Sequence, residues 1–132
     1  MRAPVKVCGI RSLKDAKIAF KYGASAIGLI FFKDSKRYIC PALAAEWVES
    51  LEPHFKKVGV FVDEEIDIVN SLSDKLGLDF IQLHGNESAA YCNLVKKPVI
   101  KAFRVHEKFN PSILDCYEVE AFLFDNYKKN EL

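Results

Sequence analysis

The stretch that decides the fold is KKVGVFVDEEIDIVNSLSDKLGLDFIQLHG, residues 56–85. Its two ends, KKVGVFV (56–62) and LDFIQLHG (78–85), are short and rich in β-branched and aromatic residues, which favours strands. The segment between them, residues 63–77, has apolar side chains at helical spacing and ends at Gly77, a residue typical of helix C-termini. A strand, a helix and a second strand joined in this way form a βαβ unit, in which the two strands run parallel.

Strands and helical segments alternate in the same way along the rest of the chain. We expect six strands, at residues 5–9, 25–32, 56–62, 78–85, 98–105 and 119–125. The expected helical segments are residues 12–23, 41–52, 63–77, 86–97 and 111–118. Ser12 and Pro41 are typical of helix starts, and Gly23 is typical of a helix end. No hairpin signal separates two strands, so the pattern predicts a parallel sheet with right-handed crossovers.

Two α/β architectures fit this pattern. One is an open, doubly wound parallel sheet, and the other is part of a (βα)8 barrel. In both, binding and catalytic side chains lie at the carboxyl ends of the strands. The 132 residues contain no linker or low-complexity segment, so we expect one domain over residues 1–132.

Composition argues against several classes of protein. Half of the residues are apolar and the formal net charge is +1, which argues against disorder and against a nucleic-acid partner. No apolar run approaches the roughly 20 residues of a membrane-spanning helix, so no membrane partner is expected. The first ten residues, MRAPVKVCGI, contain too short an apolar stretch for a secretion signal, and we therefore expect a cytoplasmic protein.

The four cysteines are expected to be reduced thiols. They form no C-x-x-C pair, and the three histidines do not lie at zinc-like spacing from them, so no metal site is expected. Without a secretion signal, reduced thiols are favoured over disulfides. We interpret Cys40, Cys92 and Cys116 as small buried hydrophobic residues.

Several reactive side chains fall at or just after the ends of the expected strands. In chain order they are Cys8, Arg37, Asp63, His84, Arg104 and Asp125. Parallel strands would bring them to one rim. Several also have a structural interpretation: Asp63 as an N-cap or first-turn acid of the next helix, Arg104 in a surface ion pair, His84 bonded to neighbouring backbone, and Asp125 as a turn cap.

Cys8 is the residue for which the catalytic interpretation is strongest. It precedes Gly9, which allows a close approach of backbone or ligand. A thiolate at this position, favoured by a nearby cation or helix N-terminus, could act as a base. Composition and spacing do not choose between this role and that of a buried apolar residue.

Five segments together resemble the phosphoribosylanthranilate isomerase family. They are KVCGIR (6–11), AIGLIFFKDSKRYI (26–39), VGVFV (58–62), IQLHGNE (81–87) and FLFDN (122–126). They occur in the family's order with sensible gaps, and the combination of KVCGI with QLHGNE is specific. The resemblance implies an α/β fold of the (βα)8 TIM-barrel family and the third step of tryptophan biosynthesis.

The resemblance also implies roles for four residues. The family's general base is the Cys of K-[IV]-C-G, which matches Cys8, and its general acid is the Asp that ends the sixth strand, which matches Asp125. Arg37 matches the Arg of the S-P-R loop motif, which contacts the anthranilate carboxylate, and His84 matches the rim His of Q-L-H-G. The implied reaction is an Amadori rearrangement of one small-molecule substrate, phosphoribosylanthranilate, which needs neither a metal nor another cofactor. Asp125 is expected to be protonated in a poorly solvated site, and Cys8 to be a thiolate.

The sequence departs from the family pattern in its loops and at its end. Lys36 replaces the usual Pro, and Arg11 stands where Thr is common; we expect both changes to be tolerated. The family continues after its sixth strand with a G-G-T-G loop and two further βα units, whose loops bind the substrate phosphate. The resemblance therefore implies a barrel that lacks its last two βα units.

An incomplete barrel has open sheet edges, and we expect residues 1–132 alone to have little isomerase activity. These edges are expected to self-associate or to bind a C-terminal fragment that carries the last two units. A second hypothesis is a catalytically silent relic or interaction module of the same fold, which pairs through its edges. A receiver-like doubly wound domain fits the length but requires an acidic cluster after the first strand, where this sequence has CGIR (8–11).

Overall fold

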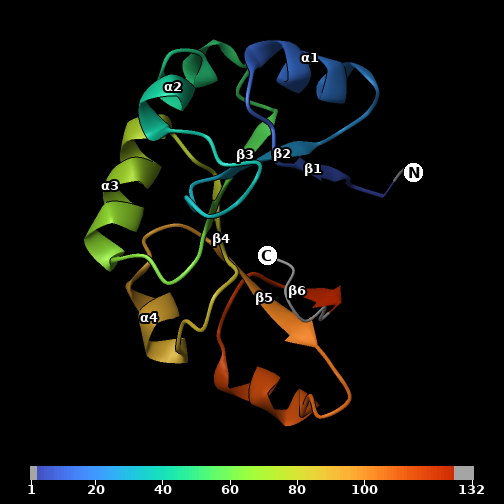
Figure 1. Ribbon diagram of the computed structural model, residues 1–132, viewed down its shortest axis with the longest axis vertical. Coiled ribbons are helices and arrows are strands. Elements are labelled where there is room, and N and C mark those ends of the chain that lie inside the picture. Colours follow the sequence, from blue (N-terminus) through green and yellow to red (C-terminus); the bar gives the residue numbers. More distant parts are fainter. Residues whose placement is uncertain (1–2, 127–132) are drawn as a thin grey trace.

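Figure 1 shows the computed structural model, which describes residues 3–126. Its strands are β1 Lys6–Cys8, β2 Ala26–Ile30, β3 Lys56–Phe61, β4 Phe80–Leu83, β5 Val99–Val105 and β6 Ala121–Asn126. Its helices are α1 Leu13–Lys21, α2 Pro41–Ala45, α3 Ile66–Leu76 and α4 Ala89–Leu94, with the 3₁₀ helices η1 Val48–Ser50 and η2 Pro111–Cys116. The predicted alternation of strands and helical segments is confirmed.

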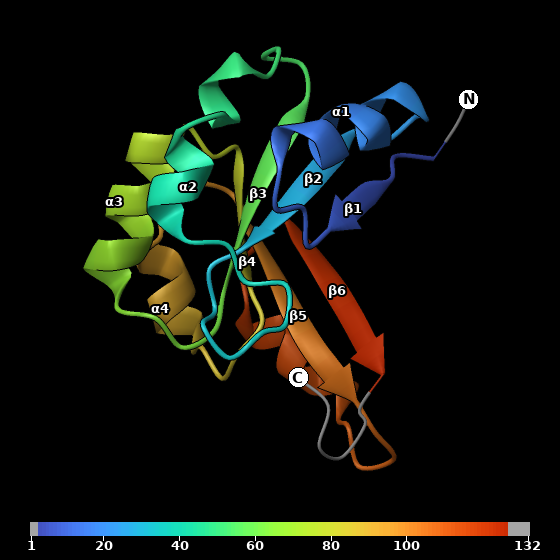
Figure 2. The same cartoon turned by 45° about the horizontal axis from the view of Figure 1, so that its top comes forward.

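The strands form one parallel sheet in the order β1-β2-β3-β4-β5-β6. A doubly wound sheet reverses its strand order at a switch point, and this sheet does not. Consecutive order is that of a (βα)8 barrel, and Figure 1 shows helices α1 to α4 in an arc outside a curled sheet. Of the two architectures that fit the sequence, the described chain therefore has the barrel type, as a curled part-barrel. Figure 2 shows β6 beside β5, with β1 at the other edge of the sheet.

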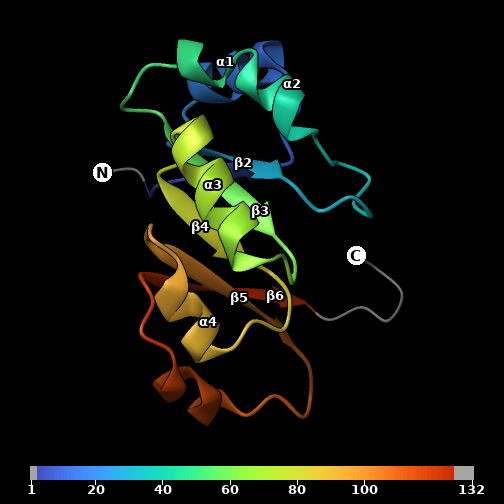
Figure 3. The ribbon, with the colours of Figure 1, turned by 90° about the vertical axis from the view of Figure 1, so that its left-hand side faces the viewer.

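The core lies between the sheet and the helices. Ile27, Leu29, Phe61, Ile81 and Leu83 are buried on the side of the sheet that faces the helices. They cluster with buried helix residues, among them Ala16, Phe20, Val69 and Leu76. Figure 3, viewed from the helical side, shows α3 and α4 in front of the sheet. Because side chains alternate along a strand, the residues between these core positions face the concave side.

Local sequence explains where the helices begin and end. The Ser12 hydroxyl accepts a hydrogen bond from the Asp15 N–H at 3.1 Å at the start of α1, as predicted. The Ser88 hydroxyl does the same for Tyr91 at the start of α4, at 3.0 Å. Gly77 ends α3 with a φ of 61°, a left-handed conformation that favours glycine.

Two predicted helices take a different form. Residues 41–52 form α2 and then the separate turn η1. Val48 and Leu51 are both buried, and a 3₁₀ turn places residues three apart on the same side. Residues 111–118 form η2, which contains no buried residue, so tertiary packing does not extend it into an α-helix.

Candidate active site

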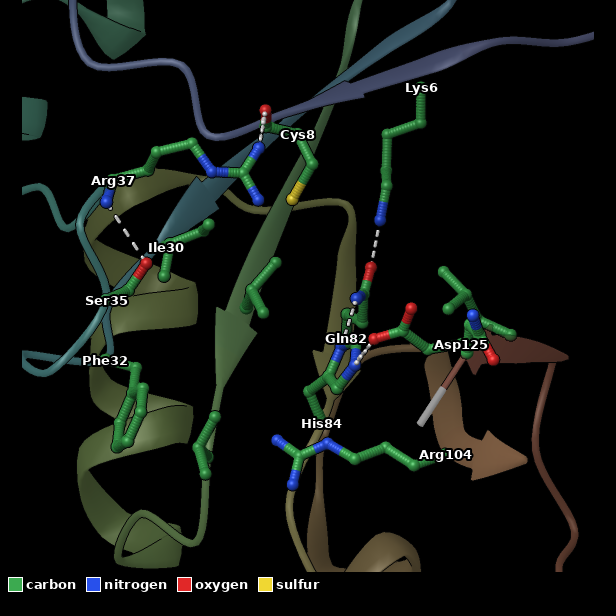
Figure 4. A pocket seen from close by; sticks show the side chains of 14 residues that line it. Lys6, Cys8, Ile30, Phe32, Ser35, Arg37, Gln82, His84, Arg104 and Asp125 are labelled. Atoms are coloured by element: carbon green, nitrogen blue, oxygen red, sulfur yellow. Dashed lines mark hydrogen bonds and ion pairs between the residues drawn. The ribbon is translucent and has the colours of Figure 1, made fainter. Parts of the chain in front are cut away.

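A pocket of about 390 Å³ opens on the concave side of the sheet, towards the carboxyl ends of the strands (Figure 4). Much of its lining consists of residue pairs two apart in sequence. These pairs are Lys6 and Cys8, Ile30 and Phe32, Val60 and Val62, Gln82 and His84, and Leu123 and Asp125. Since alternate residues of a strand point to the same face, the pocket occupies the face opposite the core.

Of the six reactive side chains expected at the rim, all but Asp63 line this pocket: Cys8, Arg37, His84, Arg104 and Asp125. Cys8 ends β1, His84 follows β4, Asp125 lies in β6, and Arg37 lies in the loop between β2 and α2. Figure 4 shows Cys8 and Arg37 on one side of the pocket, with His84 and Asp125 on the other. The fold thus brings a thiol, a guanidinium group, an imidazole and a carboxyl group from separate elements to one cavity.

Two glycines make room for Cys8 and Arg37. Gly28 pairs with Cys8 in the sheet, and a Cβ at Gly28 would lie 2.8 Å from the Cys8 Sγ. Gly9 has a φ of +85°, and a Cβ at Gly9 would lie 2.6 Å from the Cδ of Arg37. Seated against Gly9, the Arg37 guanidinium donates from Nη1 to the carbonyl oxygen of Cys8 at 2.9 Å. The thiol and the guanidinium group are thereby placed on adjoining sides of the pocket.

Hydrogen bonds within the loop that carries Arg37, and from this loop to β2, hold the loop in place. The Arg37 N–H donates to the Ser35 hydroxyl oxygen at 3.1 Å. The Ile39 N–H donates to the carbonyl oxygen of Ile30 at 3.0 Å, which returns the loop to the end of β2. These bonds restrict where the Arg37 backbone can lie relative to the pocket.

A series of polar contacts crosses the pocket from β1 to β6 (Figure 4). The Lys6 ammonium donates to the Gln82 Oε1. The Gln82 Nε2 lies 3.0 Å from the His84 Nδ1, and the His84 Nε2 lies 3.2 Å from the Asp125 Oδ2. The His84 ring therefore contacts side chains rather than neighbouring backbone, and Asp125 contacts His84 rather than capping a turn.

Burial lowers the pKa of both His84 and Lys6. For His84, loss of solvation is the largest cause of the lowered pKa; the hydrogen bond and charge of Asp125 oppose it, and the charges of Arg104 and Lys101 add to it. For Lys6, a negative charge at Cys8 opposes the effect of burial. A pKa below the ordinary 6.5 favours the neutral form of His84 at pH 7.

The solvation of Asp125 differs from the expectation of a poorly solvated acid. Its side chain is 51% exposed, whereas that of His84 is 21% exposed. Asp125 lies in β6, which is an edge of the sheet within residues 3–126, so β5 flanks it on one side only. Within this range the carboxyl group of Asp125 is therefore about half exposed.

Asp63 is not the helix cap that the sequence suggested. It has a φ of 50°, and Glu65 occupies the N-cap position of α3. The Asp63 Oδ1 instead accepts from the Asn86 N–H at 2.7 Å, and the carboxyl group fills the space where a Cβ on Gly85 would lie, 2.6 Å from it. Asp63 therefore joins the loop after β3 to the loop after β4. Asp tolerates this left-handed conformation better than most residues do.

A buried ion pair supports the loop after β4. The Lys101 Nζ lies 3.1 Å from the Glu87 Oε1, and the two side chains are 2% and 1% exposed. Lys101 also donates to the Gly85 carbonyl oxygen at 2.9 Å. The Glu87 carboxylate accepts from the N–H groups of Gly85 and Asp63, each at 2.9 Å. These bonds fix the segment that directly follows His84.

Sequence reasoning missed Lys6, Gln82 and Lys101. Lys6 and Gln82 lie two residues before Cys8 and His84. Because alternate residues of a strand share a face, the sequence could have indicated that Lys6 and Gln82 also face the pocket. Lys101 interrupts an apolar strand between two buried positions, where a charge requires a partner. The identity of that partner, Glu87, depends on tertiary structure.

Within residues 3–126, no group of three or more His, Cys, Asp or Glu side chains could hold a metal ion. In the same range, no helix is long and apolar enough to cross a membrane. The four cysteines are free thiols, of which Cys92 is buried, Cys40 is partly buried and Cys116 is exposed. Burial was thus predicted correctly for Cys92 and wrongly for Cys116, which ends the exposed η2.

Comparison with known proteins relates this pocket to one enzyme family. A family model described as N-(5'phosphoribosyl)anthranilate (PRA) isomerase matches residues 5–130. An N-(5'-phosphoribosyl)anthranilate isomerase from Geobacter sp. (strain M21) is 50% identical over 123 residues, which are 93% of this chain and 60% of the relative. The chain therefore spans about 60% of the length of this curated relative.

Solved structures agree with this relationship. The phosphoribosyl anthranilate isomerase from Thermus thermophilus matches with a TM-score of 0.87 and 37% identity, over 94% of this chain and 62% of that chain. A phosphoribosyl anthranilate isomerase in complex with reduced 1-(o-carboxyphenylamino)-1-deoxyribulose 5-phosphate matches with a TM-score of 0.83 and 33% identity, over 96% of this chain and 66% of that chain. On these matches, the chain belongs to the phosphoribosylanthranilate isomerase family.

Proposed function

We propose that this chain supplies the acid and the base of an N-(5'-phosphoribosyl)anthranilate isomerase in tryptophan biosynthesis. The observation that carries the proposal is that Cys8 of β1 and Asp125 of β6 line the same pocket. Membership of the family supports it, as does the related enzyme solved with a reduced phosphorylated deoxyribulose compound. The free cysteines fit a reducing, cytoplasmic setting.

The proposed reaction divides between the two residues. Asp125, protonated, gives its proton to the ribose ring oxygen, and the C1–O bond breaks to leave a Schiff base between C1 and the anthranilate nitrogen. The Cys8 thiolate then removes the proton from C2, and the C2–H electron pair forms a C1–C2 double bond as the imine nitrogen becomes an amine. Proton transfer from the C2 hydroxyl of this enolamine and protonation at C1 give the ketone. The sum is an aldose-to-ketose isomerisation with no net change of atoms or electrons.

Arg37 is proposed to recognise the anthranilate carboxylate. Its guanidinium group reaches the pocket beside Cys8, and its planar set of N–H donors suits a carboxylate. His84 is proposed to contact Asp125 at the rim. Residues 1–132 are proposed to act as one domain.

Arg37→Ala should raise the Michaelis constant about 10- to 100-fold with a much smaller change in kcat. The reason is that hydrogen bonds to a charged group contribute about 1.5–3 kcal/mol to binding, and this carboxylate is not part of the reacting centre. The measurement is steady-state kinetics on the active fusion defined below. Lys36→Ala is the matched control, because Lys36 is exposed and lies outside the pocket lining. An Arg37→Ala enzyme with an unchanged Michaelis constant would exclude this role.

We also propose that the edges of the sheet bind another polypeptide segment. Val5, Ile18 and Tyr22 are exposed apolar side chains near the β1 edge, and Phe124 is exposed on β6. Unpaired strand edges with apolar neighbours favour association. The proposed occupant is a C-terminal segment of the kind that the longer family members carry; self-association of this chain is the competing outcome.

The test of the proposed function joins this chain to the part of the Geobacter sp. (strain M21) relative that extends beyond the match. This fusion should convert phosphoribosylanthranilate and restore growth without tryptophan to a bacterium that lacks its own isomerase. The relative itself is the positive control. A folded fusion that neither converts the substrate nor restores growth would refute the proposal.

A further inference from the structure

Four polar side chains from three strands form one connected row in the pocket. Lys6 comes from β1, Gln82 and the following His84 from β4 and its end, and Asp125 from β6 (Figure 4). Gln82 is buried, and Lys6 and His84 are partly buried. Asp125, the proposed acid, is the terminal member of the row and faces the pocket.

The donors and acceptors in this row admit one consistent arrangement. An ammonium group only donates, so Lys6 requires the carbonyl oxygen of Gln82, and the Gln82 NH₂ is turned to the His84 Nδ1. The Nδ1 must then accept, which leaves the proton of the neutral imidazole on Nε2. That N–H donates to the Oδ2 of Asp125 across 3.2 Å.

This arrangement suits an acid at Asp125. A neutral imidazole that donates to one carboxyl oxygen leaves the other oxygen able to carry a proton. An imidazolium would instead pair with an ionised carboxylate and hold it in the form that cannot donate. A cationic His84 would also point an N–H at the NH₂ of Gln82, which is unfavourable. The charged groups that act on His84 are Asp125, which favours protonation, and Arg104 and Lys101, which oppose it.

We infer that Lys6 and Gln82 are positioning residues that fix the Nε2–H tautomer of His84, through which His84 holds Asp125 by a single carboxyl oxygen. The arrangement of the row is a property of the folded chain, and its use in catalysis rests on the proposed isomerase function. Neither residue is required to touch the substrate. Within the row, Lys6 reaches His84 through Gln82, and Gln82 reaches Asp125 through His84.

The direct test is nitrogen-15 NMR of the histidine rings in the 132-residue chain at neutral pH. His84 should show the Nε2–H tautomer, with His54 and His106 as internal references in the same spectrum. Lys6→Met should give a mixture of tautomers at His84, because Gln82 is then free to turn its amide over. Lys56→Met, which removes an exposed lysine of β3, should leave His84 unchanged. A wild-type His84 in the Nδ1–H tautomer or in a mixture, or one that does not respond to Lys6→Met, overturns the inference.

Gln82→Glu provides a second, nearly isosteric test. A carboxylate still accepts from Lys6 but also accepts from the His84 Nδ1–H, so it favours the imidazolium. The His84 titration should move to higher pH, and in the active fusion kcat should fall about tenfold or more with little change in the Michaelis constant. An unmoved titration overturns the inference whether or not the fusion is active. An inactive fusion whose His84 shows the expected NMR behaviour refutes the isomerase proposal and leaves the tautomer assignment standing.

Discussion

In the active fusion, Cys8→Ala and Asp125→Asn should each lower kcat by a factor of about 100 to 10,000, the range typical of a lost general acid or base. In the proposed mechanism both groups act on protons that move in the transition state, so the Michaelis constant should change far less than kcat. The geometric reason is that the two side chains reach the same cavity from strands at opposite edges of the sheet. Steady-state kinetics with phosphoribosylanthranilate is the measurement.

Matched controls exist for both substitutions. Cys116→Ala removes an exposed thiol at the end of η2, and Asp115→Asn neutralises an exposed carboxylate beside it. Neither residue lines the pocket, so both variants should keep wild-type kinetics. Near-normal turnover in Cys8→Ala would require a different base, and near-normal turnover in Asp125→Asn a different acid.

Lys101→Met should have the largest effect on stability, a loss of about 3–5 kcal/mol in the free energy of unfolding. The substitution leaves the Glu87 carboxylate buried without its cation, and removing one partner of a buried pair has this magnitude. A natural domain has a total stability of about 5–15 kcal/mol, so the variant would retain little margin or would not fold. Lys101 also ties β5 to the Gly85 carbonyl oxygen, which adds to the expected loss.

Urea unfolding of the 132-residue chain, followed by circular dichroism and by the fluorescence of the single tryptophan, Trp47, measures this effect. Lys96→Met is the control, because Lys96 is exposed, and its unfolding midpoint should stay close to that of the wild type. A Lys101→Met chain as stable as the wild type would mean that the buried pair does not support the loop after β4.

The strands and most helix ends could be predicted because local sequence determines them. Ser12 caps α1 and Gly77 ends α3 through bonds and backbone angles within a few residues. The strand ends also indicated which side chains share a rim, because parallel strands all point the same way. The pattern of strands and helices alone did not choose between a barrel and a doubly wound sheet; the family resemblance implied the barrel, and the consecutive strand order confirms it.

The features that could not be predicted depend on contacts between distant residues. Asp63 takes a left-handed backbone because its carboxyl group binds the Asn86 N–H, 23 residues away. Glu87 becomes the partner of Lys101 because β5 lies beside the loop after β4, and the sequence does not show this neighbourhood. The helix predicted over residues 41–52 is divided into α2 and η1, a division that helical propensity alone does not indicate.

We propose that this chain carries the acid and the base of an isomerase and that it uses them together with a further segment. The relative from Geobacter sp. (strain M21) extends beyond the match, which covers 60% of its length, and the proposed acid here is half exposed at a sheet edge. Misplacement of a reacting group by even 1 Å can lower a rate about a hundredfold. We therefore expect residues 1–132 alone to show little or no turnover.

The most direct measurement mixes this chain with a separately produced C-terminal fragment of the Geobacter sp. (strain M21) relative and follows conversion of phosphoribosylanthranilate, beside a sizing measurement of each sample. The chain alone and the fragment alone should be nearly inactive, the mixture should form a complex that converts the substrate, and the same mixture made with the Cys8→Ala chain should not. Turnover by the chain alone at the rate of the full-length relative, or equal turnover by the wild-type and Cys8→Ala mixtures, would contradict this account.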